Sequence, residues 1–295
     1  MRTREKSLTL SWLATKGSRR ITWKIIAFTL LTAGGVLFIV PFIWMVSASL
    51  KTRPQIFQFP VQWIPNPIDW TNYPEGLAFM GFLNCFRNSC IVTFGSVAGQ
   101  LLSSAMVAYG FARLRFRGRG ILFVILLATM MLPYPVTMIP KFMIFRSLGW
   151  IDTFAPLIVP TFFGAGLSGA FYIFLLRQFF MTIPLELDDA AKIDGCSYWG
   201  IFWRIILPQT RAALGAIAIF SFMWNWMDFL GPLIYLNSLD NFTISLGLNQ
   251  LVGYRYTQWG WMMAASVVAI TPPVILFFVS QKYFIRGIVV TGVKG

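Results

Sequence analysis

The stretch Ile183-Pro184-Leu185-Glu186-Leu187-Asp188-Asp189-Ala190-Ala191-Lys192-Ile193-Asp194-Gly195 is a polar island between two long apolar runs. It holds four of the ten acidic residues of the chain, with two adjacent alanines among the charges. A charged segment enclosed by membrane-like sequence indicates a short helix at a membrane surface. Such a helix could serve as a docking site for a partner, or it could simply reconnect two spans.

The island carries signals for a helix with a defined start and end. Pro184 can open a helix, because its missing N–H falls where backbone donors lack partners anyway. The acidic residues of the first turns complement the positive end of the helix dipole. Asp188 and Lys192 stand in the favourable i, i+4 order for an ion pair. Gly195 can end the helix, and the two alanines leave room for a partner surface to approach closely.

Composition places the chain in a membrane. Hydrophobic residues make up 57% of it and charged residues only 12%, against about 25% charged in soluble domains. The chain contains no His, which removes the commonest general base and the commonest metal ligand. The three cysteines, Cys85, Cys90 and Cys196, have no metal-ligand spacing, and we interpret them as structural thiols. We therefore expect an all-α polytopic membrane protein.

The apolar runs predict six membrane spans. The first run is too long for the core of a signal peptide and is expected to remain as an anchor. Residues 1–24 form a basic arm that we expect to be disordered, and residues 25–295 form the six-span domain. Residues 51–84 are expected to be an irregular loop, and residues 237–260 a polar segment. The spans are expected over residues 25–50, 88–112, 121–140, 155–176, 212–236 and 261–283.

The distribution of basic residues sets the orientation of these spans. Six spans place both termini on one side of the membrane. That side carries 18 of the 24 Lys and Arg residues, and the other side carries six. Because short cytoplasmic segments are enriched in Lys and Arg, this bias predicts cytoplasmic termini. It also accounts for the net charge of +14 without a nucleic-acid partner.

Prolines and glycines within the spans favour a transporter. We expect prolines to break spans one, three, four, five and six, and broken backbone at membrane depth is tolerated where it is buried or lines a wet cavity. The alternative is that these prolines are simply typical of membrane helices. Gly95 and Gly99 allow close helix packing in span two. The prolines concerned are Pro41, Pro133, Pro135, Pro160, Pro232, Pro272 and Pro273.

Asp228 is the only clear charge within the predicted spans, in the outer third of span five. It could face a pore or form a structural hydrogen bond. Trp224 and Trp226 lie beside it, and aromatic faces near amides suit sugar rings, although interfacial anchoring explains them equally well. A single carboxylate is a poor basis for an ion-coupled carrier. The chain has no G-x-x-x-x-G-K-[ST] loop, so it cannot bind ATP in that manner. If the protein is a pump, its energy enters through another subunit.

The island also carries a resemblance to a known family. The run Leu185-x-x-Asp188-Asp189-Ala190-Ala191-x-x-Asp194-Gly195, followed by Phe202, Ile205 and Leu207-Pro208, resembles the cytoplasmic "EAA" loop of ABC-importer permeases. Asp189 stands where that motif usually has Glu. The rest of the chain resembles the maltose-type second permease subunit of the carbohydrate-uptake branch, and Met227 stands where the family usually has Asn. The matching pieces are Ser47-Ala48-Ser49-Leu50-Lys51, Ala108-Tyr109-Gly110-Phe111-Ala112-Arg113-Leu114, Phe229-Leu230-x-Pro232-Leu233 and Gly287-x-x-x-x-Gly292-Val293-Lys294-Gly295.

This resemblance implies a type I ABC-importer fold and a transport subunit that is not itself an enzyme. Residues 183–208 would form a coupling loop in a cleft of a cytoplasmic ATPase, and the C-terminal tail would also meet the ATPases. The implied partners are a second homologous permease, two ATP-binding cassette subunits, an extracytoplasmic sugar-binding protein and membrane lipid. ATP and Mg would be bound by the partner ATPases, with no cofactor in this chain, and the location would be a bacterial cytoplasmic (inner) membrane.

The resemblance also supplies site residues. The expected docking residues are Glu186, Asp188, Asp189, Ala190, Ala191 and Gly195, and the expected substrate pathway is Trp224, Trp226 and Asp228. An ion-coupled secondary transporter and a membrane scaffold that transports nothing remain the alternatives.

Overall fold

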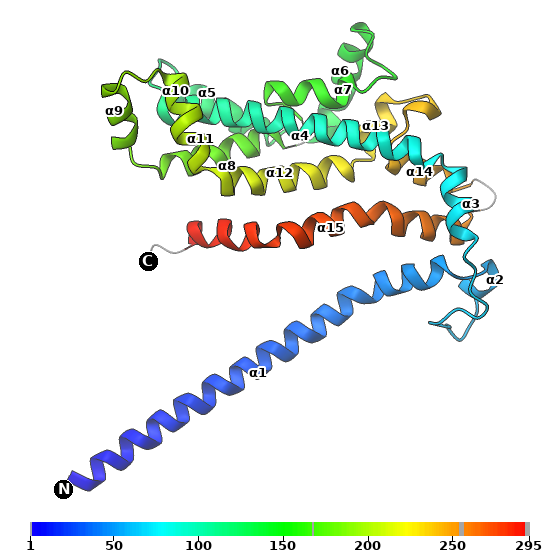
Figure 1. The fold of residues 1–295 in the computed structure, drawn as a ribbon, viewed down its shortest axis with the longest axis horizontal. Helices are drawn as coiled ribbons and strands as arrows, with labels where there is room; N and C mark the ends of the chain where they lie inside the picture. Colours follow the sequence, from blue (N-terminus) through cyan, green and yellow to red (C-terminus); the bar gives the residue numbers. More distant parts are fainter. Residues whose placement is uncertain (1, 167, 254–256, 293–295) are drawn as a thin grey trace.

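The computed structural model describes the backbone of residues 2–166, 168–253 and 257–292, and the side chains of residues 21–166, 168–253 and 257–281. Every regular element in these ranges is helical, as expected (Figure 1). Three helices are long: α1 (Arg2–Ser49), α4 (Phe82–Arg113) and α15 (Trp259–Gly292). The end of the chain at residues 293–295, where part of the predicted ATPase contact falls, lies outside the described residues.

Shorter elements make up the rest of the chain. They are α2 (Arg53–Ile56), α3 (Asn72–Phe79), α5 (Arg119–Thr129), α6 (Tyr134–Ser147), α7 (Ala155–Ile158), the 3₁₀ turn η1 (Val159–Phe163), α8 (Gly169–Met181), α9 (Glu186–Ile193), α10 (Tyr198–Ile201), the π-helical turn η2 (Phe202–Ile206), α11 (Leu207–Gln209), α12 (Arg211–Trp226), α13 (Leu230–Tyr235), the 3₁₀ turn η3 (Leu239–Asn241) and α14 (Ile244–Gln250).

The described helices provide for up to six membrane spans. Helices α1, α4 and α15 are each long and apolar enough to cross a membrane by length and composition. Three bent pairs meet the same test: α5 with α6 at 100°, α8 with α9 at 77°, and residues 198–209 with α12 at 78°. Helices α5, α8 and α12 have 11, 13 and 16 residues. A straight span needs about 20 residues, so each of these helices is too short to cross a membrane alone. Spans three, four and five are therefore interrupted, as predicted, whereas span two is the continuous helix α4.

The prolines do not all break their helices. Pro133 precedes α6, and Pro160 lies in the 3₁₀ turn η1, so spans three and four are interrupted. Span five breaks at Met227–Phe229, before Pro232. In contrast, α1 continues through Pro41 and α15 through Pro272 and Pro273, so the breaks predicted in spans one and six are wrong. A long helix keeps its flanking hydrogen bonds on both sides of a proline and can absorb the local loss.

The basic arm also differs from its prediction. The backbone is helical from Arg2 and continues into the apolar part of α1, so residues 2–24 are not disordered here. Extending an existing helix costs much less than nucleating a new one, and the arm contains no proline. The irregular loop and the polar segment likewise contain short helices, α2 and α3 in the first and η3 and α14 in the second.

Helix α4 lies at the centre of the bundle. Gly99 faces η1 so closely that an added Cβ would lie 2.6 Å from Cδ2 of Phe162, which confirms the close packing predicted for this helix. One end of the bundle is occupied by α9 and α10, and the beginning of α1 and the end of α15 point toward that end (Figure 1). Helices α3, α6, α13 and α14 lie at the other end.

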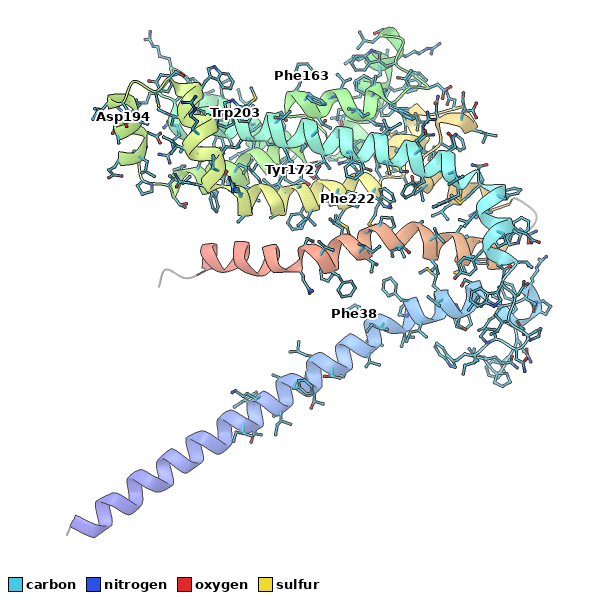
Figure 2. All side chains as sticks on the ribbon, in the orientation of Figure 1. Phe38, Phe163, Tyr172, Asp194, Trp203 and Phe222 are labelled. Carbon is cyan, nitrogen blue, oxygen red and sulfur yellow. The ribbon has the colours of Figure 1, made fainter. Side chains whose placement is uncertain are left out.

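Helix α1 leaves much of its apolar surface uncovered. None of its most apolar stretch is buried within the chain, and Phe38 is 78% exposed. Figure 2 shows α1 diverging from the bundle toward its N-terminal end, whereas Tyr172 and Phe222 lie among the packed helices. The uncovered face requires lipid or another protein chain.

Candidate functional site

Helix α9 forms where the polar island predicted it. The helix begins two residues after Pro184 and carries three acidic residues in its first turn. It ends at Gly195, which adopts a φ of +79°. The Gly195 amide donates to the carbonyl of Lys192 at 3.0 Å and the Cys196 amide to that of Ala191 at 2.9 Å. This is the Schellman arrangement, in which a left-handed residue closes a helix.

Asp188 points from α9 into the molecule. Its Oδ2 lies 3.6 Å from Nη1 of Arg113, and the two side chains are only 7% and 2% exposed. Arg113 also donates through Nη2 to the carbonyls of Phe180 at 2.8 Å and Ile183 at 2.7 Å. Burial raises the pKa of Asp188, and the nearby Arg113 guanidinium opposes that rise. The last turn of α4 is therefore fastened both to the end of α8 and to α9.

The ion pair predicted between Asp188 and Lys192 is wrong. Lys192 instead contacts Asp189, with 3.0 Å between Nζ and Oδ1, on the exposed face of α9. The hydrogen bond to Asp189 raises the pKa of Lys192. Asp188 cannot join this pair, because its carboxylate faces Arg113 on the other side of the helix.

The six predicted docking residues divide by exposure. Asp188 and Ala191 are 5% exposed each and pack against the rest of the chain. Glu186, Asp189, Ala190 and Gly195 are exposed. We call these four exposed residues the α9 face. Two of them are acidic, and the other two have a small side chain or none.

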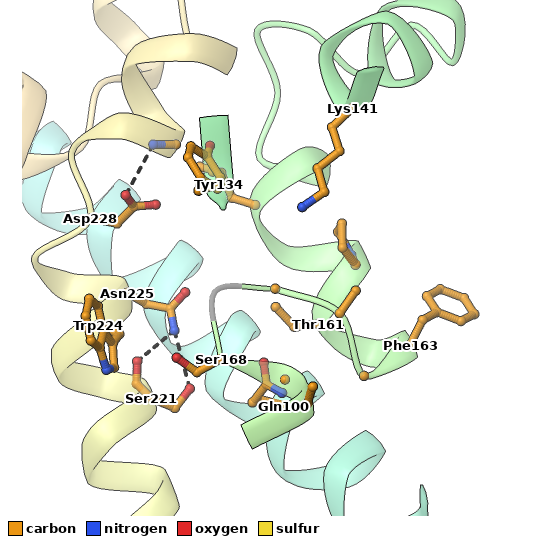
Figure 3. Close-up of a pocket in the computed structure, with 18 of the residues that line it drawn as sticks. Gln100, Tyr134, Lys141, Thr161, Phe163, Ser168, Ser221, Trp224, Asn225 and Asp228 are labelled. Carbon is orange, nitrogen blue, oxygen red and sulfur yellow. Dashed lines mark hydrogen bonds between the residues drawn. The ribbon is translucent and has the colours of Figure 1, made fainter. Parts of the chain in front are cut away.

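A cavity of about 740 Å³ lies among the broken spans (Figure 3). Its walls come from α4, α5, α6, α7, η1, α8, α12, α13 and the break before α13, with residues 164–166 and Ser168 on one side. The lining is mixed, with aromatic rings beside polar groups. The polar lining includes Gln100, Tyr134, Lys141, Ser168, Asn225 and Asp228. A chamber of this size and character suits a small polar ligand with apolar faces.

Asp228 lies in the break between α12 and α13 and borders this cavity. Its Oδ1 accepts a hydrogen bond from the Gly231 amide at 3.2 Å, and its backbone carbonyl accepts from the Ser245 hydroxyl at 2.7 Å. Figure 3 shows the carboxylate bound to the start of α13 at the edge of the cavity. Asp228 therefore borders the cavity and also makes a structural hydrogen bond, and its role in a substrate pathway stays a prediction.

Trp224 and Trp226 have separate environments. Trp224 lines the cavity and is 57% exposed. Trp226 is 6% exposed, donates from Nε1 to the Ala269 carbonyl at 3.0 Å and stacks on Phe222 with 5.3 Å between ring centroids. The prediction that Trp226 lines a substrate pathway is therefore corrected, because Trp226 fastens α12 to α15. Two residues in an i, i+2 relation point to different faces of a helix, which is the signal that separates them.

Sequence reasoning missed two charged residues. Lys141 borders the cavity, with Nζ 5.8 Å from the centroid of the Tyr134 ring. The predicted third span ends at residue 140, which leaves Lys141 outside the span. The strong bend after α5 returns the chain along α6 and so brings Lys141 back to the cavity. Arg113 is one of the basic residues on the predicted cytoplasmic side and stands in a piece that matches the family, but neither observation predicts its contacts with α8 and α9.

Within the described residues, no group of three or more His, Cys, Asp and Glu side chains could hold a metal ion. The three cysteines are free thiols, and Cys85 is buried.

Comparisons with known proteins agree with this architecture. Residues 93–290 match the family described as "Binding-protein-dependent transport system inner membrane component". The arabinooligosaccharides transport system permease protein AraQ of Halalkalibacterium halodurans is 33% identical, over 99% of each chain. The lactose transport system permease protein LacG of Rhizobium radiobacter is 33% identical, over 91% of this chain and 96% of its own. The sn-glycerol-3-phosphate transport system permease protein UgpE of Yersinia enterocolitica is 31% identical, over 90% and 95%.

Solved structures show the same likeness. A chain of a bacterial ABC transporter involved in the import of the acidic polysaccharide alginate matches with a TM-score of 0.78 and 26% identity, over 90% of this chain and 98% of that one. A chain of the bacterial alginate ABC transporter in complex with its alginate pentasaccharide-bound periplasmic protein matches with a TM-score of 0.65. At 14% identity, the second match concerns the fold alone.

Proposed function

The chain belongs to the family of binding-protein-dependent transport system inner membrane components, and on that premise we propose that it admits a sugar or oligosaccharide to the cavity beside Asp228. It is a permease subunit of an ABC importer. The observation that carries the proposal is the presence, in one chain, of a cavity at the breaks of the spans and an exposed acidic helix at the end of the bundle.

The chemistry of the cavity supports a sugar cargo. Sugar rings present apolar C–H faces and hydroxyl edges, and the chamber offers the Trp224 ring together with the Asn225 amide. The side chains of Gln100 and Ser168 border the same space. The named cargoes of the relatives, arabinooligosaccharides and lactose among them, share this chemistry.

The α9 face is proposed as the docking surface for a cytoplasmic ATPase. Its exposed carboxylates favour a basic cleft, and Ala190 and Gly195 allow close approach. Two such ATPases would bind and hydrolyse ATP with Mg, because this chain has no phosphate loop. With α9 facing the cytoplasm, the ends of α1 and α15 point to the cytoplasmic side, in agreement with the distribution of Lys and Arg.

The remaining surfaces suit the other proposed partners. The uncovered apolar face of α1 would contact lipid and a second, homologous permease. An extracytoplasmic binding protein would deliver the cargo at the opposite end of the bundle, near α3, α6 and α14. No nucleic acid is needed to explain the basic residues, which gather at the α9 end.

The alternative function is ion-coupled secondary transport. It finds less support, because Asp228 already accepts the amide of Gly231. Among the described residues, no second carboxylate borders the cavity and no ion pair joins Asp228 to Lys141. Ion-coupled carriers use partnered ionisable groups near the midplane.

Transport in reconstituted vesicles tests the proposal. The chain is reconstituted with its sister permease, the ATPases and the binding protein, and uptake of labelled oligosaccharide is measured. We expect uptake that requires ATP on the α9 side and persists when the proton gradient is collapsed. Uptake driven by a proton gradient without ATP would overturn the proposal. Neutral, acidic and phosphorylated sugars are compared to identify the cargo.

A further inference from the structure

We propose that Arg113 is a positioning residue that couples movement of α9 to α8 through Asp188. The inference rests on the proposed role of α9 as the ATPase-docking helix. It adds a residue outside the polar island to the coupling machinery and assigns a separate role to one of the acidic residues within it.

Arg113 stands where three parts of the chain meet. It lies in the last turn of α4, and its guanidinium contacts the carbonyls of Phe180 and Ile183 as well as the carboxylate of Asp188. Phe180 belongs to the last turn of α8, and Ile183 to the connection between α8 and α9. A cation at this position complements the negative end of α8. One side chain therefore fixes how α9 sits relative to the end of α8.

Helix α8 connects this junction to the cavity. Tyr172, Leu176 and Phe180 are at most 2% exposed and pack in one apolar cluster with α4. At the other end of α8, Gly169 lies so close to the Gly164 carbonyl that an added Cβ would overlap it. Both glycines line the cavity, as do Gly166 and Ser168. Since a helix of 13 residues is about 20 Å long, displacement of α9 would reach the cavity wall through one packed element.

The pair is not arranged for stability alone. Nε of Arg113 and Oδ1 of Asp188 are buried, and neither finds a hydrogen-bond partner among the described residues. Nη1 and Oδ2 are 3.6 Å apart, whereas charge-assisted hydrogen bonds measure about 2.7–2.9 Å. The contact is about 0.7–0.9 Å longer than such a bond, so a small displacement of α9 would tighten or break it. The contact between Arg113 and Asp188 therefore responds to the position of α9.

The ratio of ATP hydrolysed to cargo imported tests this inference in the reconstituted complex. For Asp188→Asn, which keeps the shape but loses the charge, we expect normal ATPase binding and a ratio about tenfold higher, within the usual range of coupling energies. Asp188→Glu, which reaches further toward Arg113, should keep the wild-type ratio. Arg113→Lys should raise the ratio, and combining it with Asp188→Asn should add little, because both act through one contact.

Tyr109→Phe is the matched control. Tyr109 lies one turn before Arg113 in α4, is buried, and donates from its hydroxyl to the Tyr198 carbonyl at 3.1 Å, without joining α8 to α9. We expect this variant to keep the wild-type ratio. A merely structural role for Arg113 would lower the amount of folded complex without changing the ratio.

The outcomes separate this inference from the proposed function. If the wild-type complex shows no ATP-driven uptake, the proposed function fails. If the wild type transports and Asp188→Asn imports with the wild-type ratio, only the inference is overturned. Should the Arg113 variant fail to fold, the contrast between Asp188→Asn and Asp188→Glu still decides the matter.

Discussion

Asp188 and Asp189 are adjacent in α9, yet their carboxylates serve opposite faces of the helix. Asp188 is buried against Arg113, whereas Asp189 is exposed and contacts Lys192. Helical geometry separates successive residues by about 100°, so adjacent acidic residues can anchor the helix and present it at the same time. The two positions should therefore respond differently to the same substitution.

The first prediction concerns the exposed carboxylate. Asp189→Asn should leave the thermal midpoint of the purified chain unchanged, because exposed ion pairs contribute little to stability. It should weaken binding of the partner ATPase by about tenfold, equivalent to about 1.4 kcal/mol. Copurification and a binding titration measure this loss. Undiminished ATPase binding would show that Asp189 takes no part in docking.

A second prediction concerns Gly195. Its φ of +79° is a conformation that most L-residues rarely adopt, and an added Cβ would meet nothing within 4 Å. Gly195→Asn tolerates the left-handed conformation and should retain most uptake. Gly195→Trp should insert into the membrane normally but lose uptake and ATPase stimulation, because the ring would project from the α9 face. Wild-type uptake by the Trp variant would refute the docking assignment.

The close approach of α4 and η1 gives a third prediction. Gly99→Ala places a methyl group against the Thr161 hydroxyl and the Phe162 ring, so we expect a loss of about 1–3 kcal/mol from overpacking. Gly110→Ala on the same helix meets nothing within 4 Å and should be neutral or slightly stabilising. Thermal midpoints in detergent compare the two. Equal midpoints would mean that η1 moves aside without cost.

Local signals predicted much of this fold. Hydropathy indicated six spans, and Pro184 and Gly195 bounded α9 within two residues. A charge within a span needs a reason, and for Asp228 the sequence left a pore-facing role and a structural hydrogen bond open; it borders the cavity and accepts the Gly231 amide. Each of these features depends on residues close together in the sequence.

Features that depend on distant residues were not predictable in the same way. The inward face of Asp188 is set by Arg113, 75 positions earlier in the chain, and no local pattern connects these two residues. Lys141 reaches the cavity because the chain bends sharply after α5, and a proline pair signals a break but not its angle. The burial of Trp226 depends on α15, which supplies its hydrogen-bond acceptor.

Asp152 gives a prediction for pH dependence. Its carboxylate accepts the amides of Asn237 at 2.8 Å and Ser238 at 2.9 Å, and also the Ser238 hydroxyl. These hydrogen bonds, that of the Ser238 hydroxyl foremost, hold the pKa of Asp152 below its usual range. Because the folded pKa lies below the unfolded value of about 3.9, the stabilisation is present above that value and lost as the pH falls through the folded pKa.

Asp152→Asn isolates this contribution, since Asn also tolerates the φ of 63° at this position. The wild type should have the higher thermal midpoint at pH 7, and the difference should shrink as the pH is lowered below about 4. Midpoints measured in detergent from pH 7 to pH 3 follow the change. A difference that stays constant with pH would show that ionisation of Asp152 does not stabilise the folded protein.

The last prediction contrasts the two tryptophans. Trp224 borders the cavity and is 57% exposed. Trp224→Ala should raise the KM for uptake about tenfold, because losing one aromatic contact in a binding site costs roughly 1–3 kcal/mol. The thermal midpoint should change little. Trp226 donates a hydrogen bond to the Ala269 carbonyl from the core. Trp226→Phe should therefore lower the thermal midpoint, because loss of this hydrogen bond costs about 1 kcal/mol. The KM should stay unchanged. Uptake kinetics and thermal unfolding are measured on both variants. Because the two residues are close in sequence but differ in surroundings, a raised KM in Trp226→Phe with none in Trp224→Ala would place the cargo path on the α15 side of α12 instead of in the cavity.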